Sequence, residues 1–445
     1  MRVLPAVLLA AGLLQSQTGD DLARAMSLAA QGRFAEAEQL LRGIETTYPD
    51  QFQVRYRLGL ILLRQGNARE AAMRFEAATK QSPNSALAWL GLAQARLRLD
   101  QRDAALQAAE QAARLGKTEP PVWRGLTMVY ASAHEFGRAA DFEERWSRSP
   151  NADPDSPLRH CRFRISAGDK VRVLEVCRQA ATTRDSSSQM QQLLGDAYRV
   201  VGDALHAVEA YQRAIALDPA DASGYLKLVA LFLDHRTPLP AITILENATA
   251  RFPKHAELRR SLGLAFYQTG DFDKALQQFL AVVDIDPDSE AGYASFETLL
   301  PMAGPRLPEI VARLRGFRER RPKSPVGHFL LARALAAGEG TPSAEIEALL
   351  RQAVQADSEF WPAHYELAQL EQTDAAIRSL THVVKLNPEH AQAHYTLAQL
   401  YARKGDRVRS VEHRKKHHAL LDRERARAER ARAESPALSF SIESR

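Results

Sequence analysis

The chain has 445 residues, of which 45% are hydrophobic, and a formal net charge of +5 at pH 7. A chain of this length would ordinarily form about two to four domains, and so small a net charge does not by itself indicate a nucleic-acid partner. The hydrophobic content, with only four tryptophans, suits helices that are rich in alanine and leucine.

The N-terminal residues predict an export signal. One arginine is followed by an apolar run over residues 3–14 and then by polar residues, which is the layout of a secretory signal peptide. The run is too short to span a bilayer, which takes about twenty residues. No cysteine follows it, which argues against a lipoprotein. We expect residues 1–16 to be a cleaved signal peptide and the mature protein to be exported, in a bacterium to the periplasm. The alternative is a cytoplasmic protein with an apolar first helix.

From residue 18 onward the sequence repeats with a period of 34 residues. The stretches GRFAEAEQLLRGIETTYP (32–49), GNAREAAMRFEAATKQSP (66–83), GDALHAVEAYQRAIALDP (202–219) and GDFDKALQQFLAVVDIDP (270–287) carry glycine, alanine, a large apolar residue and proline at the same offsets. Each unit holds two apolar patterns of helical period, separated by a turn and closed by a proline. One helix pair cannot bury its apolar face alone, so neighbouring units must stack to make the core.

Positions within a unit, counted from its first residue, show where the two helices meet. Position 8 is small where the helices must approach closely, and position 24 is large where it fills the seam. The residues that show this pattern best are Gly59, Gly195 and Gly263 at position 8 and Phe75, Tyr211 and Phe279 at position 24.

This pattern resembles the tetratricopeptide repeat (TPR) family. The resemblance implies an all-α fold, a right-handed superhelix of about twelve helix-turn-helix repeats. Nine repeat starts follow in one phase, at residues 18, 52, 86, 120, 154, 188, 222, 256 and 290. We therefore expect about eight well-phased repeats and the start of a ninth over residues 18–300.

The phase is interrupted after residue 300. The stretch PMAGPRLPEI (301–310) contains three prolines and a glycine, so residues 301–324 are expected to form an irregular break and a helix. About three further repeats should occupy residues 325–420, starting near 325, 357 and 391, the second of them shortened in its first helix. Residues 421–445 are expected to form a charged capping helix and a flexible tail.

The sequence contains little that indicates chemistry. It has no glycine-rich phosphate loop, no Gly-x-Ser-x-Gly elbow and no His-Glu-x-x-His or Cys-x-x-Cys motif. His413 and His417 share a helix face, but lysine and arginine surround them and no further ligand lies nearby, so a metal site is not expected. Glu143 and Glu144 are adjacent, point in different directions around a helix and are interpreted as solvated surface. We therefore predict no catalytic residue, no cofactor and no metal.

Two basic segments are candidate partner sites. The charged stretch at residues 413–435 is interpreted as the polar cap that a solenoid needs at its end. Its alternative is a basic helix that contacts an anionic membrane or nucleic acid, although interspersed carboxylates weaken its field. Residues 313–321 lack interleaved aromatic residues and are a weak nucleic-acid signal.

The resemblance also implies a binding surface. In TPR proteins the first helix of each repeat lines a concave groove, with positions 2, 5, 9, 12 and 13 facing inward. Mixed apolar, aromatic and charged side chains there suit a peptide ligand. The candidate groove residues are Tyr56, Leu60, Leu90, Gln94, Arg124, Met128, Arg162, Gln192, Asp196, Arg199, Arg260, Tyr267 and Tyr395.

The two cysteines, Cys161 and Cys177, occupy positions 8 and 24 of the repeat that starts at residue 154. Both lie eight residues from the turn, so they stand at the same level of an antiparallel helix pair. A disulfide needs Cα atoms about 4.4–6.8 Å apart, but position 24 partly faces the next repeat, which works against the bond. A disulfide and a pair of buried thiols are therefore both open.

These features predict a non-enzymatic scaffold that binds a protein or peptide partner in the groove, with no small-molecule substrate. The first alternative is a cytosolic regulatory or nucleic-acid-associated TPR protein that uses its basic C-terminal helix. The second is a periplasmic module for envelope or exopolysaccharide assembly.

Overall fold

The computed structural model describes residues 19–49, 51–184, 187–340 and 342–434, and all regular structure within them is helical. The predicted signal peptide at residues 1–16 and the tail at residues 435–445 lie outside the described residues. The helices fall into two compact units, residues 1–201 and 202–445. Among the described residues, no helix combines the length and the apolar character that crossing a membrane requires.

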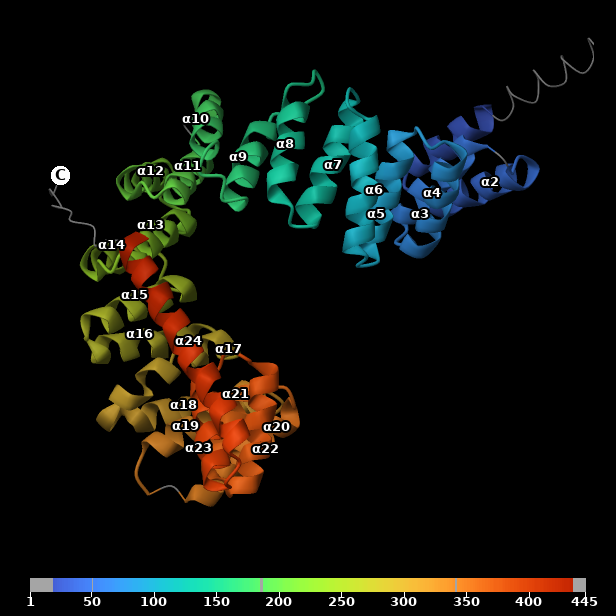
Figure 1. The fold of residues 1–445 in the computed structure, drawn as a ribbon. Helices are drawn as coiled ribbons and strands as arrows, with labels where there is room; N and C mark the ends of the chain where they lie inside the picture. Colours follow the sequence, from blue (N-terminus) through green and yellow to red (C-terminus); the bar gives the residue numbers. More distant parts are fainter. Residues whose placement is uncertain (1–18, 50, 185–186, 341, 435–445) are drawn as a thin grey trace, which may run out of the picture. The chain divides into compact units, whose positions relative to one another are not determined.

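The first unit is a row of antiparallel helix pairs (Figure 1). It begins with a helix over residues 19–30. The helices that follow are α2 (Phe34–Thr47), α3 (Phe52–Arg64), α4 (Ala68–Gln81), α5 (Ala86–Arg98), α6 (Arg102–Leu115), α7 (Pro120–Ser132), α8 (Phe136–Ser147), α9 (Ser156–Ser166), α10 (Val173–Arg184) and α11 (Ser188–Val201).

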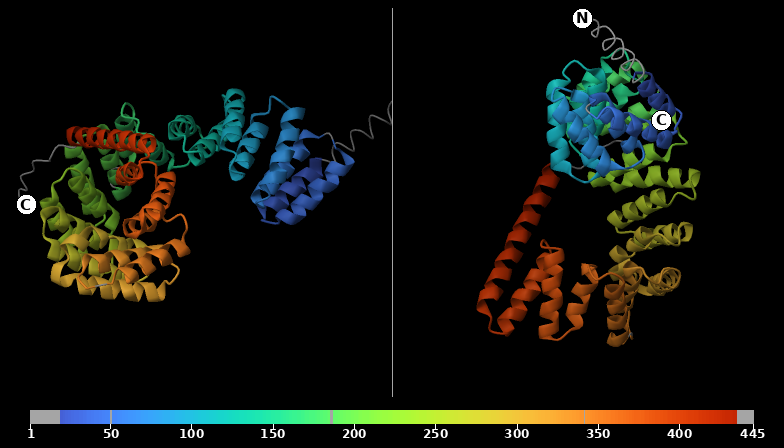
Figure 2. Two further views of the ribbon diagram at one scale, coloured as in Figure 1. Left: turned by 60° about the horizontal axis from the view of Figure 1, so that its bottom comes forward. Right: turned by 90° about the vertical axis from the view of Figure 1, so that its right-hand side faces the viewer.

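The second unit continues with the same kind of helix pair. Its elements are α12 (Ala204–Leu217), α13 (Ala222–Asp234), α14 (Pro238–Arg251), α15 (Ala256–Thr269), α16 (Phe272–Ile285), α17 (Glu290–Ala294), the 3-10 turns η1 (Glu297–Met302) and η2 (Gly304–Arg306), α18 (Leu307–Arg320), α19 (Pro325–Ala337), α20 (Ser343–Ala356), α21 (Trp361–Leu370), α22 (Thr373–Leu386), α23 (Ala391–Arg403) and α24 (Arg407–Glu434). Figure 2 shows the long α24 running beside α23.

The repeat pattern is disturbed where the sequence is richest in proline. The first helix of the repeat that starts at residue 290 is divided into α17 and η1, and Pro301 lies inside η1. Further on, α21 has 10 residues where α19 has 13, and it begins at Trp361. Prolines in a helix remove backbone hydrogen bonds, which accounts for the 3-10 turns.

In some repeats an aromatic ring at position 24 of the second helix packs against a glycine at position 8 of the first helix, and this contact holds the two helices together. In the repeat that starts at residue 52, a Cβ added to Gly59 would lie 2.9 Å from the Phe75 ring, and the same ring lies against Gly91 of the next repeat. Gly263 and Phe279 form the equivalent contact in the second unit. Only glycine leaves room for these rings, so position 8 is small because position 24 is large.

A second regularity was not anticipated from the sequence. At position 4 of several repeats a side chain donates a hydrogen bond to the carbonyl six residues earlier, in the turn that follows the preceding second helix. Trp89 donates to Pro83 (2.8 Å), His328 to Pro322 (3.0 Å) and, in the last repeat, His394 to Pro388 (3.1 Å). Because each bond gives a turn carbonyl a partner from the next helix, these donors stabilise the link between repeats.

Candidate functional site

A concave site lies in the first unit, where two cavities of about 460 and 380 Å³ share Leu60, Gln94 and Met128. Together they form one groove along the first helices of three successive repeats, α3, α5 and α7. The residues that line it are Tyr56, Leu60, Leu63, Arg64, Leu87, Leu90, Gly91, Gln94, Leu97, Arg98, Pro121, Arg124, Gly125, Met128, Val129, Ser132 and Trp146.

Helix geometry explains why these residues meet. Positions 2, 5, 9 and 12 are separated by three or four residues, and position 13 follows position 9 by four, so they share one face of each first helix. Glycines at position 6 of two repeats, Gly91 and Gly125, let neighbouring helices approach; a Cβ on Gly125 would contact the Leu90 side chain. The structure therefore brings together six of the candidate residues, namely Tyr56, Leu60, Leu90, Gln94, Arg124 and Met128.

The groove has an apolar floor with one large exposed side chain. Leu63 and Leu90 are buried in the floor, whereas Met128 is 63% exposed. Tyr56 stacks on Phe52 with the ring centroids 5.9 Å apart, and burial raises the pKa of its phenol, so the hydroxyl is neutral at physiological pH. An exposed, flexible methionine over an apolar floor suits contact with apolar ligand side chains.

The charges around this groove all have one sign. Arg64, Arg98 and Arg124 line it, and none of the carboxylates that the structure describes does. Within the described residues, none of the three guanidinium groups forms an ion pair: Arg98 donates to the Leu63 carbonyl (3.1 Å) and Arg124 lies over the Trp146 ring, 5.5 Å from its centroid. The indole N–H of Trp146 is buried, with no acceptor among the described residues. The groove thus presents three guanidinium groups that no described carboxylate neutralises.

Several lining residues were missing from the predicted set. Leu63 and Leu97 are at position 12, and Arg64 and Arg98 are at position 13. The same inward positions that selected the other candidates would have found these four. Trp146 lies on a second helix, and its place in the groove depends on how α8 packs against α7, for which the sequence holds no direct signal.

The remaining candidates in the first unit have different surroundings. Arg162 is exposed on α9, and Asp196 and Arg199 lie on α11. Gln192 is only 7% exposed, so its side chain belongs mainly to the packing of α11. These four residues do not line the groove of α3, α5 and α7, and a binding role for them stays a prediction.

Three candidates lie in the second unit. Arg260 forms an ion pair with Glu257 (2.5 Å) on the same helix, and this pair lowers the pKa of the Glu257 carboxyl. Tyr267 packs on Phe272, and Tyr395 is 41% exposed beside the ring of His417. A binding role for these residues also stays a prediction.

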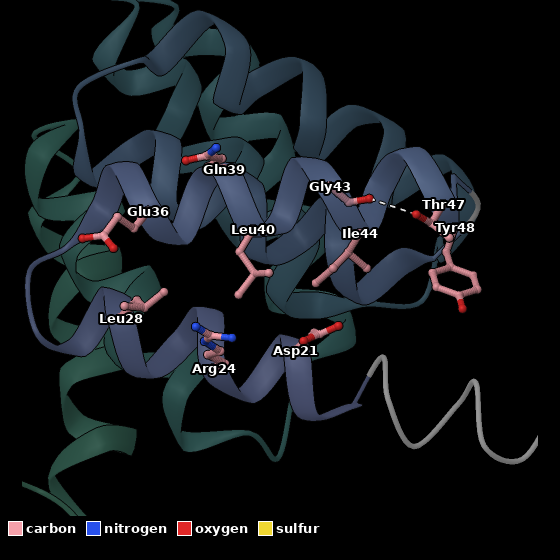
Figure 3. Close-up of a pocket in the computed structure, with 10 residues that line it drawn as sticks. All are labelled: Asp21, Arg24, Leu28, Glu36, Gln39, Leu40, Gly43, Ile44, Thr47 and Tyr48. Carbon is pink, nitrogen blue, oxygen red and sulfur yellow. Dashed lines mark hydrogen bonds between the residues drawn. The ribbon is translucent and has the colours of Figure 1, made fainter.

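A second hollow of about 540 Å³ lies between the helix over residues 19–30 and α2 (Figure 3). Leu28, Leu40 and Ile44 point into the space between the two helices, and Asp21 and Arg24 lie at its edge. It involves a single repeat and mixes charges of both signs, whereas the groove spans three repeats with charges of one sign. The groove is therefore the candidate site.

The interpretation of Glu143 as solvated surface was wrong. Its side chain is 1% exposed and accepts hydrogen bonds from Ser156 Oγ (2.6 Å) and Arg159 (2.8 Å), which also pairs with Asp153. The sequence pattern missed this because α9 packs directly on α8 and brings its own cation and hydroxyl to the carboxylate. A buried charge is tolerated only with such partners.

A second charged group lies close by. Arg164 is fully buried, and its guanidinium contacts Asp141 (2.7 Å), Asp169 (3.3 Å) and Glu144 (3.4 Å). It also donates to Nε2 of His160 (3.3 Å). Burial lowers the pKa of His160 to about 4, and the neighbouring Arg164 contributes. Every charge in this group has a partner, which indicates a structural role.

The two cysteines lie in the same region. Cys161 on α9 and Cys177 on α10 form a buried disulfide, with their Cα atoms 4.9 Å apart. Positions 8 and 24 are therefore in contact here, as they are in the glycine–phenylalanine repeats.

The histidines of α24 are engaged by the last repeat. Nδ1 of His413 lies 2.8 Å from Nδ1 of His394, and Nδ1 of His417 lies 2.9 Å from the carbonyl of Ala391. Burial lowers the pKa of both His394 and His413. Among the described residues, no group of three or more histidine, cysteine or carboxylate side chains is arranged to hold a metal ion.

The repeats can now be compared with known families. A tetratricopeptide repeat profile matches residues 22–72, 56–120, 226–290 and 365–412, and a second profile of the same repeat matches residues 188–221. The chain belongs to the tetratricopeptide repeat family. The prediction of an all-α TPR superhelix is thereby confirmed, within the residues that the structure describes.

Curated relatives include two yeast proteins named peroxisomal targeting signal receptor. The Pichia angusta protein is 25% identical over 42% of this chain and 34% of its own length, and the Kluyveromyces lactis protein is 23% identical over 52% and 41%. This TPR chain thus spans less than half the length of these relatives. Among solved structures, yeast Tom70 is similar with a TM-score of 0.45 and 13% identity, over 94% of this chain and 96% of that chain.

Proposed function

We propose that this TPR protein is a non-enzymatic scaffold that binds a segment of a partner protein in the groove of α3, α5 and α7. The observation that carries the proposal is the groove itself: three first helices share one concave face, with an apolar floor, an exposed Met128 and unpaired arginines at its edge. A concave, mainly apolar surface with a few polar groups is typical of a ligand site.

The relatives support the same class of function. The yeast proteins are named as receptors of a targeting signal, which fits recognition of a peptide segment. The similarity covers less than half of each yeast protein, so neither a signal nor a compartment is carried over to this chain.

The test uses two exposed methionines as a matched pair. Met128 in the groove is 63% exposed, and Met73 on the second helix α4, which lines a separate hollow of about 840 Å³, is 64% exposed. Replacing either by glutamate should leave the fold intact. A cellulose-bound array of peptides is probed with the wild-type full chain, with Met128→Glu and with Met73→Glu.

We expect wild type and Met73→Glu to bind the same peptides and Met128→Glu to lose most of them. The added carboxylate would have to be desolvated under an apolar ligand side chain, which is costly. If Met128→Glu binds the same peptides as strongly as wild type, the groove is not the binding site and the proposal is wrong.

We also propose that the protein is exported after cleavage of residues 1–16. The apolar run over residues 3–14 and the pairing of Cys161 with Cys177 support this proposal, since disulfides persist mainly in oxidising compartments. Cell fractionation with N-terminal sequencing tests it. A mature chain that begins at Met1 in the cytoplasmic fraction would overturn the proposal.

A further inference from the structure

We infer that the groove takes an extended segment with an apolar side chain between two carboxylates, spaced as acidic–x–apolar–x–acidic. The inference rests on the proposed function and adds the chemical class of the partner. It follows from where the groove's charges and apolar side chains lie along the first helices.

The groove runs parallel to the helices that form it. Its two cavities overlap at position 9 of three repeats (Leu60, Gln94 and Met128). One cavity extends from there toward position 2 and the other toward position 13. Eleven residues of helix correspond to roughly 16 Å at 1.5 Å per residue. An extended chain advances about 3.3 Å per residue, so about five residues fill this length.

The cations lie toward opposite ends of this length. Arg124 is at position 5, beside Trp146, whereas Arg64 and Arg98 are at position 13. Eight residues separate these positions along the helix axes, so Arg124 on α7 and Arg98 on α5 are offset by about 12 Å in that direction. In an extended segment, residues i and i+4 are about 13 Å apart. Carboxylates at i and i+4 would therefore each meet a guanidinium group.

The apolar centre follows from the same geometry. Side chains at i, i+2 and i+4 of an extended chain point to the same side, so the side chain at i+2 faces the middle of the groove. There it would contact Leu60, Leu90 and Met128, while the residues at i+1 and i+3 point outward. No carboxylate lines the groove to repel the ends of such a segment.

An acid that could compete for Arg124 is already engaged. Asp153, whose pKa is lowered chiefly by its hydrogen bond to Arg159 and only slightly by Arg124, pairs with Arg159 at 2.8 Å. Elsewhere in the same unit Arg42, Arg74 and Arg96 each bind a carboxylate. Arg64, Arg98 and Arg124 differ from them in lacking such a partner, which is the complementarity that an acidic segment would satisfy.

The probe is a set of fluorescein-labelled peptides with the cores Glu-Ser-Leu-Ser-Glu, Gln-Ser-Leu-Ser-Gln and Glu-Glu-Leu-Ser-Ser. Affinity for the full chain is measured by fluorescence anisotropy. The first peptide should bind about tenfold more tightly than the other two, and added salt should reduce this advantage. The double variant Arg98→Gln/Arg124→Gln should abolish it. Arg69→Gln, which changes an exposed arginine of the second helix α4, should leave it unchanged.

Equal affinity for the first two peptides would overturn the inference but not the proposed function, because a neutral apolar segment would still occupy the groove. Equal affinity for the first and third would overturn the spacing. If none of the three peptides binds but binding to the peptide array still depends on Met128, the inference is overturned and the proposed function stands. A single-stranded oligonucleotide that binds more tightly than the first peptide through Arg98 and Arg124 would also overturn it, because the cations would then serve a nucleic acid.

Discussion

In the repeat that starts at residue 52, the ring of Phe75 lies on Gly59, whereas in the repeat that starts at residue 154 the same two positions hold Cys161 and Cys177 in a disulfide. Both arrangements join the first helix of a repeat to its second helix at the same level. A ring on a glycine needs only good packing, while a disulfide fixes the pair covalently.

The residues around the two contacts also differ, because one contact lies in an apolar core and the other among buried charges. The repeats that form the groove have an apolar core and leave arginines unpaired at the concave face. Around the disulfide, α8, α9 and α10 bury charges instead, with Arg164 and Glu143 both held by partners. In the first region charge is available for a ligand; in the second it is used within the fold.

The largest effect is expected from removing the ring. Phe75→Ala should lower the unfolding free energy by about 3–5 kcal/mol, because the ring is fully buried and contacts glycines of two repeats. Urea denaturation followed by circular dichroism measures this. Phe136→Ala, at a half-buried position of α8, is the control and should cost clearly less. Equal losses would mean that the ring-on-glycine contact has no special role.

The repeat architecture could be predicted from the sequence because its determinants are local and recur. Glycine at position 8, a large residue at position 24 and proline at the end of each unit identify the helices and their contacts without reference to distant residues. The candidate groove residues on α3, α5 and α7 followed from the same phase together with the inward positions that the resemblance to TPR proteins implies.

The rest depends on how particular neighbours pack. The buried state of Glu143 requires Ser156 and Arg159 from the next repeat, and the place of Trp146 in the groove requires the approach of α8 to α7. A periodic sequence pattern shows where a residue lies in its repeat, but it does not show which side chains of the neighbouring repeat contact that residue. The position-4 donors were similarly missed, because their acceptors are backbone carbonyls and leave no mark in the sequence.

The covalent contact can be removed without changing the charges around it. Cys161→Ala/Cys177→Ala should lower the unfolding free energy by about 3 kcal/mol, as expected for a loop of this size. A reducing agent should cause a comparable loss in wild type and none in the double variant. Thiol counting on the denatured, non-reduced protein checks the bond directly, and two free thiols would contradict it.

The need for glycine at position 8 can be tested at Gly263 in the second unit. A Cβ at Gly263 would lie 2.7 Å from Cδ1 of Phe279, so Gly263→Leu should destabilise by about 1–3 kcal/mol through overpacking. Gly316→Ala on α18 is the control, since its Cβ would meet only the flexible end of Arg320, at 3.4 Å. An unchanged urea midpoint for Gly263→Leu would show that position 8 has room to spare.

The charged surroundings of the disulfide predict a pH dependence that the groove repeats should lack. His160 is 8% exposed and accepts a hydrogen bond from Arg164, so protonation would both bury a charge and place it beside a cation. Burial, and next the charge of Arg164, lower its pKa to about 4 from the usual 6.5. Between these values the unfolded chain binds a proton that the folded protein does not, so stability falls as the pH drops from 6.5 to 4.

At pH 5 this difference corresponds to about 2 kcal/mol of lost stability relative to neutral pH. His160→Gln keeps an acceptor for Arg164 but cannot take up a proton. Urea unfolding of both proteins at pH 7.5 and pH 5 separates His160 from the other titrating groups, which are common to both. Wild type should lose about 2 kcal/mol more than the variant between the two pH values. Equal losses would show that His160 can be protonated without disturbing the buried Arg164, and that the charged region is no more sensitive to acid than the apolar one.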